Sequence, residues 1–210
     1  QNTYRINLFI DNPKWRSGVA ESSYYIANVW KDYVNRLGVD PVFYSGNNPI
    51  PIKVIYPNTK TSECSSTDPL TQAKIPWSCS SGKVIWYTQE HGLQWDTIAH
   101  ELAHSLNSKF WDGRLPAGAG GNHSINTCYP GYTSPGLGMA LTEGFADFMA
   151  VWHGYRAPSR DTNFRGTGIY PRRIGYNVEA PPNLNDCQNG IENELLVAKT
   201  FWDLYDFRQD

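Results

Sequence analysis

Two histidines and a glutamate lie close together in the segment HELAH, which runs from His100 to His104. The residues around this segment predict an α-helix. At about 3.6 residues per turn, His100 and His104 then lie one above the other on one face of the helix. Two imidazoles so placed can bind one Zn²⁺, and Glu101 can reach a water molecule at that ion. We therefore interpret the segment as part of a metal site rather than as a helix with two unrelated histidines.

A second helix supplies the carboxylates that such a site needs. A catalytic zinc uses three protein ligands and a water, so the two histidines leave one protein ligand to be found. The helix predicted over 137–152 contains the segment EGFAD, in which Glu143 and Asp147 lie one turn apart on one face. Glu143 can complete a His₂Glu ligand set, and Asp147 can accept the second ring N–H of His100. A solvated acidic pair is the alternative, but the rest of this helix is almost wholly apolar.

The extended three-histidine pattern of the metzincins is absent. That pattern would place Gly at position 107 and His at position 110, where this chain has Asn107 and Phe110.

The HExxH and ExxxD motifs together resemble the gluzincin branch of zinc metallopeptidases, the thermolysin-like and fungalysin-like group. The likeness covers the two motif helices, and the interval between them is longer than in thermolysin-like members. The resemblance implies a zincin fold, one zinc ion and hydrolysis of peptide bonds. It implies His100, His104 and Glu143 as ligands, Glu101 as catalytic base and Asp147 as the partner of a ligand histidine.

The resemblance also implies an oxyanion donor, because gluzincins place a Tyr or His of the C-terminal lobe beside the tetrahedral intermediate. The sequence does not choose among the candidates, which are His153, Tyr155, Tyr170 and Tyr176. A lone histidine at the position of His153 is more often a surface residue.

The overall composition argues against some classes of binding partner. The chain has 210 residues and a formal net charge of −2, which argues against nucleic acid or an anionic membrane as the main partner. No apolar run reaches the roughly 18 to 20 residues that a transmembrane helix needs. We expect a monomer that acts on a polypeptide.

The cysteines and the start of the chain favour secretion. Cys64, Cys79, Cys128 and Cys187 form no C-x-x-C pair, and their loop-like surroundings indicate disulfides rather than a thiolate zinc site. We favour the pairs Cys64–Cys79 and Cys128–Cys187; four free thiols in a cytosolic protein are the alternative. The chain opens without an initiator Met or a signal-peptide pattern. We therefore expect a mature product from which a leader has been removed.

The hydrophobic pattern predicts an α+β chain of one domain, 1–210, with an N-terminal lobe of about 1–108 and a mostly helical C-terminal lobe, 109–210. The first lobe should hold a mixed sheet and the HExxH helix. The predicted strands are 4–10, 42–44, 52–56 and 83–88. The predicted helices are 17–37, 93 or 95 to 108, 137–152 and 193–207, and the predicted loops are 57–82, 109–136 and 154–190.

Three packing expectations follow from the same pattern. Strand 83–88 is either a sheet edge that can pair with an extended peptide or a fully paired interior strand. In the HExxH helix, Ile98, Leu102 and Leu106 should face the core. The stripe expected to be apolar on the last helix consists of Leu196, Val197, Thr200, Phe201, Leu204 and Tyr205.

The sequence thus predicts a secreted zinc-dependent endopeptidase in which Glu101 activates a zinc-bound water. Two alternatives stay open: a zinc hydrolase of other amides or esters, and a zincin fold kept as a non-catalytic binding module. Zinc is the predicted cofactor, and the sequence makes no prediction about calcium.

Overall fold

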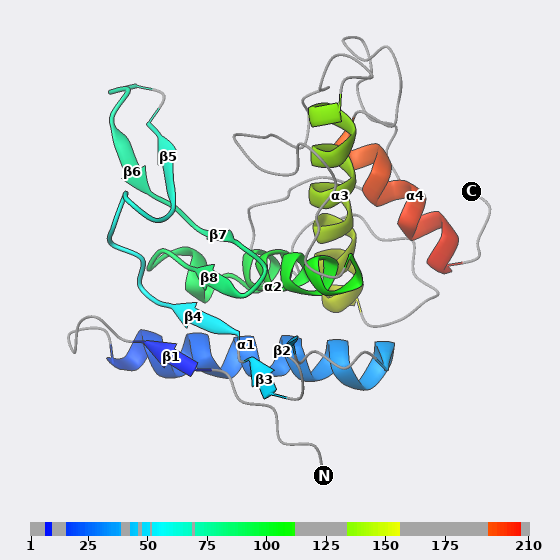
Figure 1. Cartoon of the computed structure of the whole chain (residues 1–210), viewed down its shortest axis with the longest axis horizontal. Helices are drawn as coiled ribbons and strands as arrows, with labels where there is room; N and C mark the ends of the chain where they lie inside the picture. Colours follow the sequence, from blue (N-terminus) through cyan, green and yellow to red (C-terminus); the bar gives the residue numbers. More distant parts are fainter. Residues whose placement is uncertain are drawn as a thin grey trace. The chain divides into compact units, whose positions relative to one another are not determined.

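The computed structural model describes residues 7–9, 16–38, 43–45, 48–50, 52–68, 70–111, 134–155 and 193–206. The chain divides into two units, Gln1–Lys109 and Phe110–Asp210. Four α-helices and several short strands occur among the described residues, so the content is mixed α and β, as predicted (Figure 1).

The first unit contains a four-stranded mixed sheet of order β1-β4-β8-β7 (Figure 1). Its strands are β1 (Asn7–Phe9), β4 (Lys53–Ile55), β7 (Cys79–Ser80) and β8 (Val84–Trp86). Strands β1, β4 and β8 run parallel, and β7 pairs antiparallel with β8. Parallel neighbours require crossover connections, and helix α1 lies in the connection from β1 to β4.

Strand β8 decides whether the predicted strand 83–88 lies at the edge or in the interior of the sheet. It lies between β4 and β7, with Ile85 paired to Val54 on one side and to Ser80 on the other. It is therefore an interior strand over its described length, and the expectation of an edge strand at this position is wrong.

Helix α1 (Arg16–Leu37) packs its apolar residues inward as the helical spacing predicted. Ile26, Val29 and Tyr33 are fully buried. The helix ends at Leu37, the predicted end, and is followed by Gly38, whose φ of +64° is accessible to glycine at little cost. The Gly38 N–H donates to the Val34 carbonyl at 3.1 Å, which closes the helix C-terminus.

The segment predicted as a loop over 57–82 contains regular structure, so that prediction is wrong. Strands β5 (Ser65–Thr67) and β6 (Lys74–Pro76) form an antiparallel hairpin, and β7 follows. Alternation of apolar and polar residues is weak in these short strands, so the pattern gave no signal. The predicted disulfide Cys64–Cys79 is present and joins the start of the hairpin to β7.

A second short hairpin lies earlier in the chain. Strands β2 (Phe43–Ser45) and β3 (Asn48–Ile50) pair antiparallel, with Tyr44 opposite Pro49. Strand β3 lies between the predicted strands 42–44 and 52–56, where the sequence analysis expected no strand.

Helix α2 (Trp95–Phe110) carries the HELAH segment. Ile98, Leu102 and Leu106 are at most 1% exposed, which confirms the predicted core face. The turn η2 (His91–Leu93) precedes the helix.

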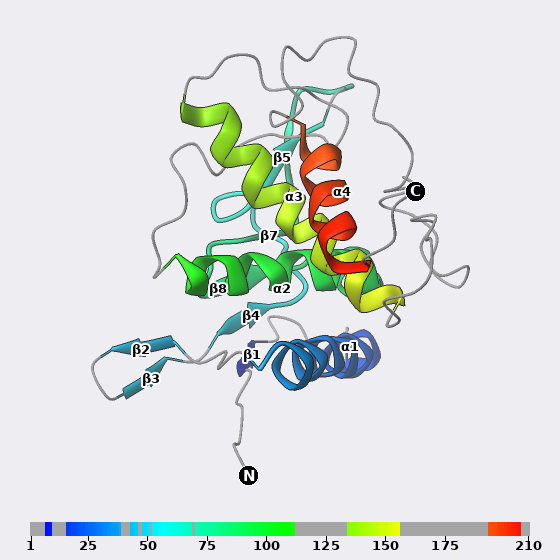
Figure 2. The same ribbon diagram turned by 90° about the vertical axis from the view of Figure 1, so that its right-hand side faces the viewer.

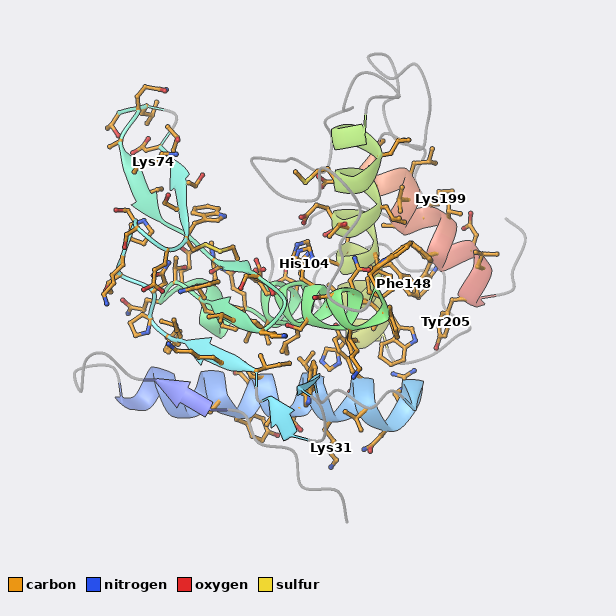
Figure 3. All side chains as sticks on the ribbon, in the orientation of Figure 1. Lys31, Lys74, His104, Phe148, Lys199 and Tyr205 are labelled. Atoms are coloured by element: carbon orange, nitrogen blue, oxygen red, sulfur yellow. A yellow bond between two sulfur atoms is a disulfide. The ribbon has the colours of Figure 1, made fainter. Side chains whose placement is uncertain are left out.

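The second unit contains α3 (Ser134–Tyr155) and α4 (Glu194–Asp206), which pack side by side (Figure 2). Rings on both helices join them: Phe148 lies 5.6 Å from Phe201 and 6.2 Å from Tyr205, measured between ring centroids. Phe148 and Tyr205 are labelled in Figure 3. Asn193 caps α4 through its Oδ1, which accepts the Leu196 N–H at 3.0 Å.

The predicted apolar stripe of α4 is partly wrong. Leu204 is 68% exposed, whereas Leu195, Ala198 and Trp202 are buried. The buried face is therefore rotated from the predicted one, because Ala198 and Trp202 pack inward in place of Leu204. None of the described helices is long and apolar enough to cross a membrane.

Candidate metal centre

The two histidines of α2 face each other across one helical turn. Their Nε2 atoms lie 3.1 Å apart, and their ring planes stand at 88°. His104 is buried and His100 is half-buried; the side chain of His104 is labelled in Figure 3. The i,i+4 spacing read from the sequence therefore produces the convergence of ring nitrogens that the prediction required.

This spacing fits two ligands of a single ion. With zinc–nitrogen bonds of about 2.0 to 2.1 Å and a tetrahedral angle, two ligand nitrogens lie about 3.3 Å apart. The 3.1 Å observed between the Nε2 atoms is close to that value. The same distance also allows a hydrogen bond between the rings, in which one nitrogen donates and the other accepts.

Glu101 lies between the histidines in sequence and is buried, with 6% of its surface exposed. Its negative charge raises the pKa of Tyr87, although burial of Tyr87 is the larger cause. The Glu101 carboxylate is therefore close enough to Tyr87, which follows β8, to affect its ionisation. A buried carboxylate costs free energy unless it is compensated, so such a residue is retained for a reason.

Helix α3 holds the predicted carboxylates in the second unit. Glu143 and Asp147 are 6% and 4% exposed, so the alternative of a solvated acidic pair is wrong. Gly144, next to Glu143, lies against α4: a Cβ at this position would approach the Glu194 carbonyl oxygen to 2.6 Å. The turn of α3 that carries the carboxylates is therefore in close contact with α4.

The donor set of the three predicted ligands fits zinc. His100, His104 and Glu143 each offer one ligand atom, two imidazole nitrogens and one carboxylate oxygen. Nitrogen and carboxylate ligands are the set that zinc takes in catalytic sites.

The oxyanion-donor candidates divide between described and undescribed parts of the chain. His153 is 3% exposed, so the expectation of a surface histidine is wrong. Tyr155 is the last residue of α3. Tyr170 and Tyr176 lie outside the described residues, and so do Cys128 and Cys187.

Sequence reasoning missed a group of polar contacts around α2. The Tyr33 and Tyr87 hydroxyls donate to backbone carbonyls of this helix, and the Nδ1 atom of buried His91 lies 2.8 Å from Ser78 Oγ. The two tyrosines fit the apolar pattern of their elements and were read only as core residues. No local signal in the sequence distinguishes a buried tyrosine that binds a distant carbonyl from one that merely packs.

Comparison with known proteins adds no assignment: no family model, no curated protein and no solved structure matches this chain.

Proposed function

We propose that this chain is a zinc-dependent endopeptidase of the gluzincin type with a zincin-like fold. In this proposal His100 and His104 of α2 and Glu143 of α3 hold one zinc ion. Glu101 is the catalytic base, and Asp147 orients a ligand histidine. The pair of Nε2 atoms 3.1 Å apart on α2 is the observation that carries the proposal.

The burial of the motif residues supports a catalytic use. Glu101, His104, Glu143 and Asp147 are all buried polar side chains. Ionisable groups are costly to bury, and functional sites are one of the places where this cost is met because the chemistry needs such groups. A non-catalytic binding module would not need an intact base next to an intact ligand pair.

The chain's own residues divide the work of hydrolysis. When bound, zinc polarises the scissile carbonyl and makes water acidic near neutral pH. Glu101 takes a proton from the attacking water as the C–O bond forms, and gives it to the nitrogen as the C–N bond breaks. Asp147 accepts the N–H of a ligand imidazole and so fixes its tautomer.

The test compares two Glu→Gln variants for zinc content and peptide hydrolysis. Glu101→Gln removes the base without removing a ligand, so we expect it to keep one zinc per chain and to lose hydrolysis by about 10²- to 10⁴-fold. Glu90→Gln, at an exposed position of the same unit, is the matched control and should keep both. Full activity in Glu101→Gln would show that the proposed mechanism is wrong.

The substrate class is tested with the parent protein. A denatured protein should be cut at internal peptide bonds, with fragments mapped by mass spectrometry, and small esters should be poor substrates. Chelation should abolish the cleavage and added zinc should restore it. Ester hydrolysis without cleavage of the protein would favour the other class of zinc hydrolase.

We further propose that the protein is secreted. The Cys64–Cys79 disulfide supports this, because such bonds persist in oxidising compartments.

A further inference from the structure

Two buried tyrosines donate to consecutive backbone carbonyls of α2. Tyr33 Oη of α1 lies 2.8 Å from the Ala99 carbonyl oxygen, and Tyr87 Oη, just after β8, lies 3.0 Å from that of Ile98. Both tyrosines are fully buried. These two carbonyls immediately precede His100 and Glu101 in the chain.

The two hydrogen bonds constrain the helix in more than one direction. Inside an α-helix each carbonyl already accepts an N–H four residues later, so a tyrosine hydroxyl uses its second lone pair. Consecutive carbonyl oxygens lie about 100° apart around the helix axis. Because the donors come from two separate parts of the unit, together they limit both the rotation of α2 and its shift along its axis.

The hydroxyls remain donors over the working range of pH. Burial raises the pKa of Tyr33 well above its ordinary value, with a smaller contribution from the charge of Asp32. Burial also raises the pKa of Tyr87, followed by the charges of Glu101 and Tyr33. Both side chains therefore stay protonated well into alkaline solution.

We propose that Tyr33 and Tyr87 are positioning residues for the metal-binding turn of α2. They fix the rotation and the axial position of the turn that carries His100 and His104, and so the direction in which the two Nε2 atoms face. This inference rests on the proposed function. It assigns the two tyrosines a role beyond filling the core. Any nearby acceptor would satisfy a buried hydroxyl, yet both hydroxyls donate to carbonyls of α2.

Three Tyr→Phe variants separate positioning from simple stability. Tyr33→Phe and Tyr87→Phe each remove one of the two bonds. Tyr56→Phe is the matched control, because Tyr56 is also buried and its hydroxyl donates to the Gln89 carbonyl at 3.1 Å, outside α2. Zinc affinity of the metal-free proteins is measured by competition with a chromogenic chelator, cobalt(II) absorption reports ligand geometry, and urea unfolding reports stability.

We expect all three variants to lose stability to a similar extent. Only Tyr33→Phe and Tyr87→Phe should weaken zinc affinity, by about tenfold, the lower end of what loss of an outer-shell contact costs. The same two variants should change the cobalt(II) spectrum, and Tyr56→Phe should not. Equal zinc affinity and equal spectra in all three would overturn the inference while leaving the proposed function intact.

Two further results of these experiments bear on the inference. A parent protein that binds no zinc overturns the proposed function, and the inference falls with it. If Tyr87→Phe does not fold, 4-fluorophenylalanine at position 87 fills the space of the hydroxyl without donating, and the same comparison with Tyr56→Phe applies.

Discussion

Helix α2 of the first unit and helix α3 of the second carry the proposed zinc ligands, and each is held within its own unit by different contacts. In α2 the backbone before the motif receives two tyrosine hydroxyls at 2.8 and 3.0 Å. In α3 the turn with the carboxylates is held by packing, with Gly144 against α4 and rings such as Phe148 on the same interface. Directional hydrogen bonds fix the first helix, and shape complementarity fixes the second.

This difference predicts which substitutions should destabilise each helix. For α2, loss of a hydroxyl donor should be costly in addition to changes in the volume of its buried apolar residues. A helix fixed by close packing is sensitive to an added methyl group, because protein interiors are close-packed and relax only partly.

Removing a ligand from either helix should have the largest effect. His104→Ala on α2 and Glu143→Ala on α3 each delete a proposed ligand, so each should weaken zinc affinity by more than the roughly 10- to 100-fold loss expected for Asp147→Asn. Competition with a chelator measures all three. Tight zinc binding by Glu143→Ala would remove α3 from the site and leave α2 as the only metal-binding helix.

Adding a methyl group to α3 should have the next largest effect. In Gly144→Ala the new Cβ would lie 2.6 Å from the Glu194 carbonyl oxygen and 2.6 Å from Val197 Cβ. Neither atom is the end of a flexible side chain, so we expect a loss of about 1 to 3 kcal/mol in the free energy of unfolding. Urea unfolding measures it.

The control for Gly144→Ala lies on the surface of α4. Lys199→Ala deletes an ion pair with Asp203 at 3.6 Å and should cost at most about 0.5 kcal/mol. A Gly144→Ala protein as stable as this control would contradict the view that close packing fixes α3.

The helical content of the fold was predictable because it depends on local periodicity. The apolar spacing located α1 and α2, and Gly38 marked a C-terminus that only a residue tolerant of positive φ fits well. The β5–β6 hairpin escaped prediction because its short strands show little alternation of apolar and polar residues. The face of α4 was misjudged because burial follows its contacts with α3 and not hydrophobicity alone, as exposed Leu204 shows.

The geometry of the two histidines within α2 was predictable for the same reason. The i,i+4 spacing placed His100 opposite His104 because helix geometry is fixed. The tyrosine contacts join Tyr33 to Ala99 across a large separation in sequence. Such a contact depends on how elements pack, and no spacing rule contains that information.

Alkaline pH should weaken the first unit through the tyrosines that anchor α2. Their pKa values are raised in the fold, so the unfolded chain ionises first, at about pH 10. Above that pH the folded state binds more protons, and stability falls by up to about 1.4 kcal/mol per pH unit for each tyrosine.

Urea unfolding at several pH values from 8 to 11 measures this fall. The double variant Tyr33→Phe and Tyr87→Phe should be less stable than the parent at pH 8, and the difference should narrow as the pH rises. A constant difference across this range would mean that the tyrosines do not ionise on unfolding.

The smallest effect is expected for hydrogen bonds at the surface. These bonds are exposed to water, unlike the buried tyrosine bonds to α2. The Asp68 carboxylate at the β5–β6 turn accepts the N–H of Leu70 at 2.8 Å and of Thr71 at 3.3 Å. The Leu70 bond is the main cause of the lowered pKa of Asp68, followed by bonds from Thr71. Because the pKa of Asp68 is lowered in the folded state, the stabilisation from these bonds is fully present above the pKa of the unfolded chain. It is lost as the pH falls through the pKa of the folded state. The NMR chemical shifts of the Leu70 and Thr71 amides should therefore change only in acid, below the ordinary pKa of an aspartate. This change should be absent in Asp68→Asn. A change at higher pH would disprove the assignment.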